Sequence, residues 1–178
     1  MKKQIIETQR LILCEMDDSV LEDLSKILQD DKVMYAYNGA FNKEETQAWL
    51  QKQIKRYHDY GFGLWGVWLK DNSEMIGQCG ITMQDYLDGV VPEIGYLLAY
   101  KYWHNGYAIE AAKSCLEYGF NTLHFKKMYS IIRNNNEASQ KVAIRNGMKP
   151  IGTKLIHYRG MDMPHIVFCT ECANKKNL

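Results

Sequence analysis

The chain has 178 residues, of which 46% are hydrophobic and 24% are charged. That is enough apolar material to close one core, and the length falls within the usual size of one domain. Lys and Arg together number 22 against 21 Asp and Glu, so no overall field draws the chain to nucleic acid or to an anionic membrane. We expect a small neutral partner, or one that is recognised locally.

Two features of the sequence indicate a cytoplasmic protein. Glu7 interrupts the N-terminal residues before an apolar run of secretory length develops, and no apolar stretch is long enough to span a bilayer. The five cysteines are odd in number and mostly far apart, which fits reduced thiols better than a disulfide framework. We expect four of them to be small hydrophobic residues of the core.

The end of the chain carries residues of the kinds that bind zinc. Cys169 and Cys172 have the spacing of a metal-binding or redox pair, and His157 and His165 lie upstream. A second CxxC pair and a helical HxxxH pair are both missing, and the two cysteines end a strand-like run. The sequence therefore favours no metal site.

In chain order, a strand and two helices are predicted over the first sixty residues. Polar N-caps place the helices: residues 17–19 open the first, and Asn42, with Glu45 at the capping-box position, opens the second. The apolar segment 34–39 between them has no clear periodicity. The predicted elements are a strand at 10–14, a helix from 17–19 to about 28, and a helix from 42 to about 61.

Strands and helices alternate over the rest of the chain. Their order predicts an α/β fold with a mixed sheet and helices on both faces, in a single domain over 1–178 with a core of about 8–170 and a short C-terminal tail at 171–178. The elements are strands at 64–69, 75–83, 90–98 and 128–132, helices from 106 and over 137–146, and a hairpin from 151 to 169 that turns near Arg159 and Gly160.

The segment 102–108 lies between a strand and the start of an apolar helix. Its backbone N–H groups therefore point outward from a helix N-terminus, and such an end binds phosphate. Gly106 permits close approach of a pyrophosphate to the backbone, and the small Ala108 lets the helix pack tightly. The loop matches neither a P-loop nor a GxGxxG fingerprint. From these features alone, the alternative to a phosphate-binding turn is an ordinary strand-to-helix turn that binds no ligand.

Two separated blocks resemble one family. Residues 92–98 (PEIGYLL) and 102–111 (YWHNGYAIEA) resemble the acetyl-CoA motif of the GCN5-related N-acetyltransferase (GNAT) superfamily, and are most similar to its RimJ/RimL ribosomal-protein acetyltransferase branch. Residues 133–139 (RNNNEAS) and 146–148 (NGM) are similar to a second motif of that branch. The resemblance covers nearly the whole chain. It implies a three-layer αβα fold with a central mixed, mostly antiparallel sheet, and acetyl-CoA as cosubstrate.

The resemblance implies three sets of coenzyme contacts. The loop 103–108 would hold the pyrophosphate, the strand around 97–99 would pair its backbone with the pantetheine arm, and Asn136 would reach the coenzyme from the other side. Ser139 matches the motif's serine, with a plain polar contact in the first helical turn as the alternative. The residues expected to bind acetyl-CoA are Leu97, Leu98, Ala99, Trp103, His104, Asn105, Gly106, Tyr107, Ala108, Asn136 and Ser139.

Two positions in the loop depart from the branch. It usually carries Gly where His104 stands and Lys or Arg where Asn105 stands, so this loop is bulkier and less positive. We expect weaker coenzyme affinity but not its loss, because backbone amides supply most donors in such a loop.

Glu93 is the expected catalytic residue. It matches the carboxylate on the family's central strand, which implies that it accepts the amine proton directly or through one water. An exposed strand carboxylate is the alternative. The position of the family's frequent acid, a Tyr, falls here on Ala143, so water or another group would protonate the thiolate. His104, Tyr96 and Tyr107 are available, though such residues more often pack or cap a helix.

The resemblance implies a primary amine as the acceptor, and we expect a protein or peptide α-amine to be preferred. A small-molecule amine (a polyamine, an amino acid or an aminoglycoside) is the alternative, as is a noncatalytic acyl-CoA-binding module, which His104, Asn105 and Ala143 favour. A homodimer through the final hairpin is a further expectation. Six aromatic residues are candidates for the acceptor pocket, with core packing as the alternative: Tyr35, Tyr37, Phe41, Trp65, Trp68 and Tyr86.

Overall fold

Strands of very different length build one mixed sheet. In the computed structural model, which describes residues 3–172, eight strands pair in the order β1-β2-β3-β4-β5-β6-β8-β7. Every neighbouring pair is antiparallel except β5 with β6, which is parallel. The strands are β1 (Gln4–Glu7), β2 (Leu11–Cys14), β3 (Leu64–Leu69), β4 (Met75–Tyr86), β5 (Gly89–Leu98), β6 (Lys127–Arg133), β7 (Lys149–Tyr158) and β8 (Met161–Glu171).

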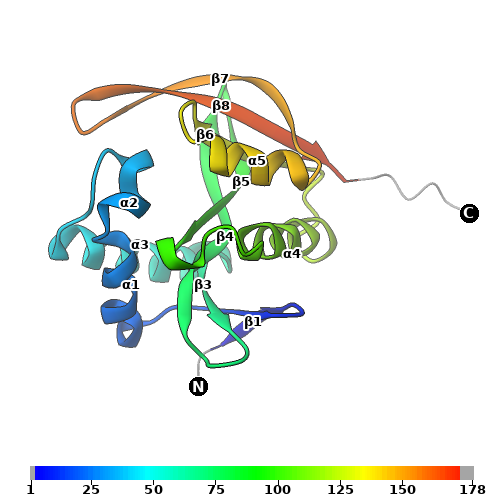
Figure 1. Ribbon diagram of the computed structural model, residues 1–178. Helices are drawn as coiled ribbons and strands as arrows, with labels where there is room; N and C mark the ends of the chain where they lie inside the picture. The colour runs from blue at the N-terminus through cyan, green and yellow to red at the C-terminus, as the bar shows by residue number, and fades with distance from the viewer. Residues whose placement is uncertain (1–2, 173–178) are drawn as a thin grey trace, which may run out of the picture.

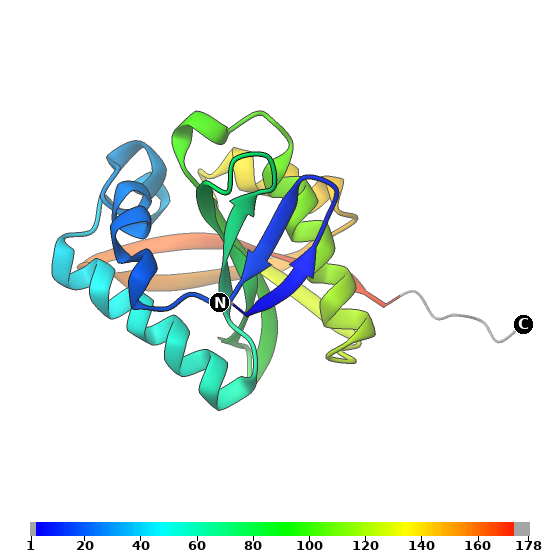
Figure 2. The same cartoon turned by 90° about the horizontal axis from the view of Figure 1, so that it is seen from below.

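Helices cover both faces of the sheet (Figures 1 and 2), as predicted. The helices α1 to α3 lie on one face, and α4 and α5 lie on the other, which confirms the three-layer arrangement. None of the described helices is long and apolar enough to cross a membrane. The helices are α1 (Leu21–Leu28), α2 (Asp31–Met34), α3 (Lys43–Tyr60), α4 (Tyr107–Asn121) and α5 (Glu137–Arg145), with 3-10 turns η1 (Asp18–Val20), η2 (Tyr35–Tyr37) and η3 (Tyr100–Tyr102).

The ends of α3 follow the predicted local signals. Asn42 Oδ1 accepts a 2.7 Å hydrogen bond from Glu45 N, and Glu45 Oε2 accepts a 2.9 Å bond from Asn42 N. This reciprocal capping box satisfies two amide donors that the first turn leaves without partners. At the other end Gly61 has a φ of +76°, the left-handed conformation that closes many helices. The α3 helix is thereby fixed in place along the edge of the site described below.

Two apolar layers hold the helices to the sheet. The first lies between the sheet and α4, where small residues let the helix approach closely; it includes Ala111, Ala112, Cys115, Trp65, Ile81 and Ile94. The second lies beneath α1 and α3 and includes Leu24, Ile27, Leu28, Leu50, Met34 and Trp68. Four cysteines (Cys14, Cys79, Cys115 and Cys169) are buried, as expected, and Cys172 is exposed.

The structure differs from the predicted elements mainly at the N-terminal edge. Strand β1, which was not predicted, pairs with β2 through positions such as Ile6 opposite Leu13. A four-residue strand with charged or polar ends has no clear alternating signal, and its pairing comes from the tertiary fold. The apolar segment 34–39 folds as the end of α2 and the turn η2. The expected tail of 171–178 lies, beyond Cys172, outside the described residues.

Candidate active site

The candidate site begins where the sheet opens between β5 and β6. Glu93 opposite Tyr129 is the register position at which these parallel strands pair. Just beyond it, Ser130 Oγ donates a 3.0 Å hydrogen bond to Ile94 O. Past this point β5 stays paired with β4 through to Leu98, whereas no register position joins it to β6. One edge of β5 therefore faces a gap inside the sheet.

Backbone hydrogen bonds show which groups of β5 face this gap. Leu98 O accepts a 2.8 Å bond from Trp103 Nε1, whereas Ala99 N donates a 2.8 Å bond to Ile76 O, next to β4. Because successive residues of an antiparallel strand direct their backbone groups to opposite edges, the N–H and C=O of Tyr96 point into the gap with those of Leu98. An extended ligand that lies along this edge finds donors and acceptors there.

The gap continues into a cavity of about 1050 Å³. Residues of two regions form most of its wall, and we call these the loop side and the α3 side. The loop side comprises lining residues from 95–98, 102–109 and 136–145, and the α3 side comprises those from 49–56, 154–158 and 163–165. Of the residues expected to bind coenzyme, the cavity wall includes Leu97, Leu98, Trp103, His104, Gly106, Tyr107, Ala108, Asn136 and Ser139. The other two do not line it: Ala99 lines the second cavity described below, and Asn105 is exposed in the turn before α4.

The turn before α4 presents backbone donors rather than acceptors. Asn105 Nδ2 donates a 2.9 Å bond to Trp103 O, and Arg10 Nη1 donates a 3.0 Å bond to Asn105 O, so both carbonyls already have partners. Gly106, with a φ of +80°, is the N-cap of α4. The amides of the first helical turn have no partner within the helix. Together with the helix dipole, these groups suit an anion such as a phosphate.

Arg10 and Glu110 brace this turn from the start of β2. Arg10 Nε donates a 2.7 Å bond to Glu110 Oε2, and Thr8 Oγ1 donates a 2.7 Å bond to Glu110 Oε1. The Arg10 guanidinium lies 4.4 Å from the centre of the Tyr107 ring. Burial alone would raise the pKa of Glu110, but the hydrogen bonds from Thr8 and Arg10 outweigh it and lower that pKa. This contact cannot be predicted from the sequence, because its partners lie about one hundred residues apart in the chain.

The start of α5 forms the far wall of the loop side. Asn136 Oδ1 accepts a 3.1 Å bond from Ser139 N, which caps the helix, and a 2.7 Å bond from Tyr35 OH. Ser139 O in turn accepts a 2.6 Å bond from Tyr96 OH, which joins β5 to α5 across the gap. The helix start is thus fixed by Asn136, and Ser139 contributes through its backbone.

Glu93 lies at the narrow end of the gap, half-buried and lining the cavity. Its Oε1 accepts a 3.1 Å bond from Ile131 N, and its Oε2 accepts a 3.2 Å bond from Thr82 Oγ1. Burial raises the pKa of Glu93 to about 7, although those two hydrogen bonds and the charges of Arg56 and Lys154 act in the opposite direction. A carboxyl group with this pKa can exchange a proton near neutral pH.

The structure separates the remaining candidates. Ala143 is 1% exposed and packs in the core between α5 and β6, so its position carries no proton donor. Tyr96 lines the cavity with its hydroxyl bonded to Ser139 O, His104 is exposed, and Tyr107 is covered by Arg10. None of these three side chains is singled out as an acid by its contacts.

Only part of the expected aromatic set reaches the cavity. Tyr35 and Tyr37 line it, together with Trp49, which was not predicted. Trp65 and Trp68 are buried in the two core layers, which agrees with the alternative of core packing. Phe41 packs behind the wall with its ring centre 5.6 Å from that of Trp49, and Tyr86 packs 6.1 Å from Tyr129.

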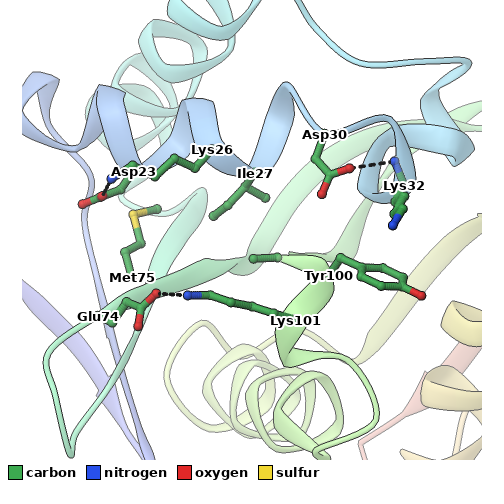
Figure 3. Close-up of a pocket in the computed structure, with 10 residues that line it drawn as sticks. Asp23, Lys26, Ile27, Asp30, Lys32, Glu74, Met75, Tyr100 and Lys101 are labelled. Carbon is green, nitrogen blue, oxygen red and sulfur yellow. Dashed lines mark hydrogen bonds and ion pairs between the residues drawn. The ribbon is translucent and has the colours of Figure 1, made fainter.

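A second cavity, of about 620 Å³, lies between α1, the start of β4 and η3 (Figure 3). Its charged groups already have partners: Lys26 Nζ lies 2.9 Å from Asp23 Oδ1, and Lys101 Nζ lies 2.6 Å from Glu74 Oε1. Asp30 caps α2 by accepting a 2.9 Å bond from Lys32 N. The charged groups of this second cavity therefore serve to pair with one another or to cap a helix, and the β5–β6 cavity remains the candidate site. Among residues 3–172, no group of three or more His, Cys, Asp or Glu residues is placed to hold a metal ion.

Comparison with known proteins agrees with this geometry. A family model described as an acetyltransferase (GNAT) domain matches residues 10–149. The chain is 40% identical over 147 residues to the uncharacterized protein YkkB of Bacillus subtilis (strain 168), which covers 82% of this chain and 86% of that protein. It is 29% identical over 153 residues to the uncharacterized N-acetyltransferase YoaA of the same organism, covering 83% and 84%.

Solved structures share the fold at lower identity. An acetyltransferase of the GNAT family from Bacillus anthracis superposes with a TM-score of 0.79 at 24% identity, covering 93% of this chain and 97% of that one. RimL, a ribosomal L7/L12 alpha-N-protein acetyltransferase, gives a TM-score of 0.82 at 18% identity, covering 97% and 96%. RimL has also been solved in complex with coenzyme A. The chain therefore belongs to the GNAT family and is an N-acetyltransferase that takes its acetyl group from acetyl-CoA.

Proposed function

We propose that this enzyme acetylates the α-amine of a protein or peptide, with Glu93 as the general base. The neutral amine attacks the thioester carbonyl carbon, the carbon–sulfur bond breaks, and the coenzyme leaves as a thiolate. Glu93 accepts the proton that the amine nitrogen loses. The thiolate takes a proton from water, since Ala143 offers no hydroxyl.

The single observation that carries this proposal is the placement of Glu93. Its carboxylate lies where β5 and β6 separate, held by Ile131 N and Thr82 Oγ1, on the wall that the loop side and the α3 side share. A coenzyme whose pyrophosphate binds the amides of 103–108, and whose pantetheine arm follows the edge of β5 at Tyr96 and Leu98, would bring its thioester toward this carboxylate. Asn136 and Ser139 would close the coenzyme channel from α5.

The pKa of the base favours an α-amine over a lysine. At pH 7, removing the proton costs about 1.4 kcal/mol for an α-amine with a pKa near 8 and about 4.6 kcal/mol for a lysine near 10.4. A base with a pKa of about 7 is well matched to the first of these amines and poorly matched to the second. RimL, which shares the fold, is named as an alpha-N-protein acetyltransferase, and this supports the same acceptor class.

Thiol release from acetyl-CoA tests the proposal. The pure protein should release thiol with short peptides that have a free α-amine, and much less with the same peptides when only a lysine side chain is free. Glu93→Gln should lower the rate with both. A protein that releases no thiol with any α-amine would overturn the proposed acceptor class.

A further inference from the structure

The α3 side of the cavity carries an excess of positive charge. Lys52 and Arg56 stand one helical turn apart on α3, and Lys154 lies on β7; all three line the cavity. Among the described lining residues of the α3 side there is no carboxylate, and Glu93 at the end of the gap is the nearest acidic group of the wall. An acceptor that enters from this side therefore meets cations before it meets the base.

The guanidinium of Arg56 is held in a fixed position by a buried amide. Gln53, which is 0% exposed, accepts a 3.0 Å bond from Arg56 Nη1 and a 3.4 Å bond from Leu64 N with the same side-chain oxygen. Because the buried side-chain amide of Gln53 is held by these hydrogen bonds, it orients the guanidinium of Arg56 before any ligand binds. Such preorganisation is typical of a binding group rather than of a solvated surface charge.

Arg56 and Lys52 have no carboxylate partner within the part of the chain that the structure describes. Every ion pair found among residues 3–172 leaves both of them out. Lys55, on the same helix but facing away, pairs with Asp59 at 2.6 Å. Burial, followed by the charge of Arg56, lowers the pKa of Lys52. The charge of Glu93 acts on Arg56 from the end of the gap, but neither cation forms an ion pair among the described residues, so both gain from binding an anion.

We infer that the acceptor amine carries a carboxylate a few bonds away from its nitrogen, which Arg56 and Lys52 bind while Glu93 receives the amine proton. Lys154 adds to the positive field from β7, although its Nζ donates to Asp85 O. The inference rests on the proposed function, and it narrows the class of acceptors to α-amines with a nearby carboxylate. A bidentate guanidinium–carboxylate contact would orient the amine as well as attract it.

Cationic acceptors fit this arrangement poorly. A polyamine or an aminoglycoside would place further ammonium groups beside Arg56 and Lys52, where like charges repel in a partly desolvated cavity. The carboxylate can belong to an acidic side chain next to the N-terminus of a peptide or to the free α-carboxylate of an amino acid. Both sources share the same chemistry.

Thiol release with matched acceptors separates these cases. We would compare C-terminally amidated tripeptides that differ at the second residue (Asp, Asn or Lys), a free amino acid with its amide, and spermidine. The wild-type enzyme should show a kcat/KM about tenfold higher for the Asp peptide than for the Asn peptide, because a hydrogen bond between charged groups is stronger than one between a charged and a neutral group. The Lys peptide and spermidine should react more slowly than the Asn peptide. A preference for the free amino acid over its amide, larger than that for Asp over Asn, would identify the α-carboxylate as the source.

Variants on α3 show whether Arg56 and Lys52 cause the preference. Arg56→Gln and Lys52→Gln should each reduce the Asp-over-Asn ratio toward one, and this ratio compares two acceptors on the same variant, so a change in the base Glu93 affects both rates alike. Arg56→Lys keeps the charge but loses the two parallel N–H donors of the guanidinium, so it should retain part of the ratio. Lys55→Gln removes one charge from the same helix outside the cavity and should leave the ratio unchanged. Thermal unfolding of each variant checks that the fold is intact.

The outcomes distinguish this inference from the proposed function. Equal rates with the Asp, Asn and Lys peptides, or a ratio that survives in the double variant of Arg56→Gln and Lys52→Gln, would overturn the carboxylate preference alone. Absence of thiol release with every acceptor would overturn the α-amine proposal and the inference together.

Discussion

Arg10 Nε donates a 2.7 Å hydrogen bond to Glu110 Oε2, across a separation of one hundred residues in the chain. The contact joins the start of β2 to the first turn of α4, and Arg10 Nη1 extends it to the carbonyl of Asn105. A residue near the start of the chain thus holds the turn before α4 from outside the cavity, which helps to fix the direction of the amides of the turn. This relationship makes the geometry of the turn depend on a side chain that never faces the cavity.

Arg10→Ala should weaken acetyl-CoA binding by about tenfold, which corresponds to about 1.4 kcal/mol, because the turn loses its brace. The change should be visible in the dissociation constant measured by calorimetry, with a smaller effect on kcat at saturating coenzyme. Lys3→Ala, which removes an exposed charge that pairs with Glu15, serves as the control. Identical affinities in the two variants would show that the brace has no part in coenzyme binding.

The pH dependence of turnover should follow Glu93. Because burial raises its pKa to about 7, the carboxyl group is protonated and inactive as a base below that pH, and becomes available above it. With a peptide α-amine, kcat/KM should therefore rise through two ionisations, that of Glu93 and that of the amine near pH 8. In Glu93→Gln only the ionisation of the amine should remain, and the rate should fall most for amines of high pKa. A variant with the wild-type profile would remove Glu93 from the mechanism.

The same carboxyl group should reduce stability at high pH. Its folded pKa is raised above the unfolded value, so the folded state binds the proton more tightly between about pH 4.5 and pH 7, and stability is lost as pH rises through that window. In denaturant titrations at pH 8, the free energy of unfolding of Glu93→Gln should therefore exceed that of wild type by on the order of 2 kcal/mol, and the difference should shrink at pH 4.5. Glu22→Gln, at a side chain that is 88% exposed, should show no such trend.

His104 should cost both stability and coenzyme affinity. Its φ is +63°, a left-handed conformation that glycine adopts at no steric cost. His104→Gly should stabilise the fold by about 0.5–1 kcal/mol because it relieves this strain, and should tighten coenzyme binding because it removes a bulky side chain from the coenzyme loop. His124 is also exposed and has a φ of +59°, but it lies after α4. His124→Gly should change stability by a similar amount and leave the affinity alone, so equal effects on affinity would contradict a role for the turn.

Local signals in the sequence predicted much of this fold. The capping box of Asn42 and Glu45, and the hairpin turn at Arg159 and Gly160, both depend on residues within a few positions of each other. Strand β1 escaped prediction because its pairing with β2 comes from tertiary contacts rather than from its own pattern. Elements with strong local chemistry were therefore predictable, and an element defined by its neighbour was not.

The candidate site shows the same division. Motif resemblance pointed to Glu93 and to the turn before α4, but not to the groups that set their properties. Glu93 is held by Ile131, 38 residues later, and the turn by Arg10. The conformation of His104 was also hidden, although the family's Gly at that position was a clue. Contacts between residues so far apart leave no spacing in the sequence from which they can be predicted.

The unpaired edge of β5 has a consequence for how this protein behaves among other proteins. A free strand edge on the outside of a sheet invites edge-to-edge association with a second chain. Here the free edge lies inside the sheet, with β6 beyond it and Tyr96 joined to Ser139 across the opening. The hydrogen-bonding groups of this edge therefore remain available to an extended ligand in the cavity, and they do not form an outer edge with which a second chain could pair.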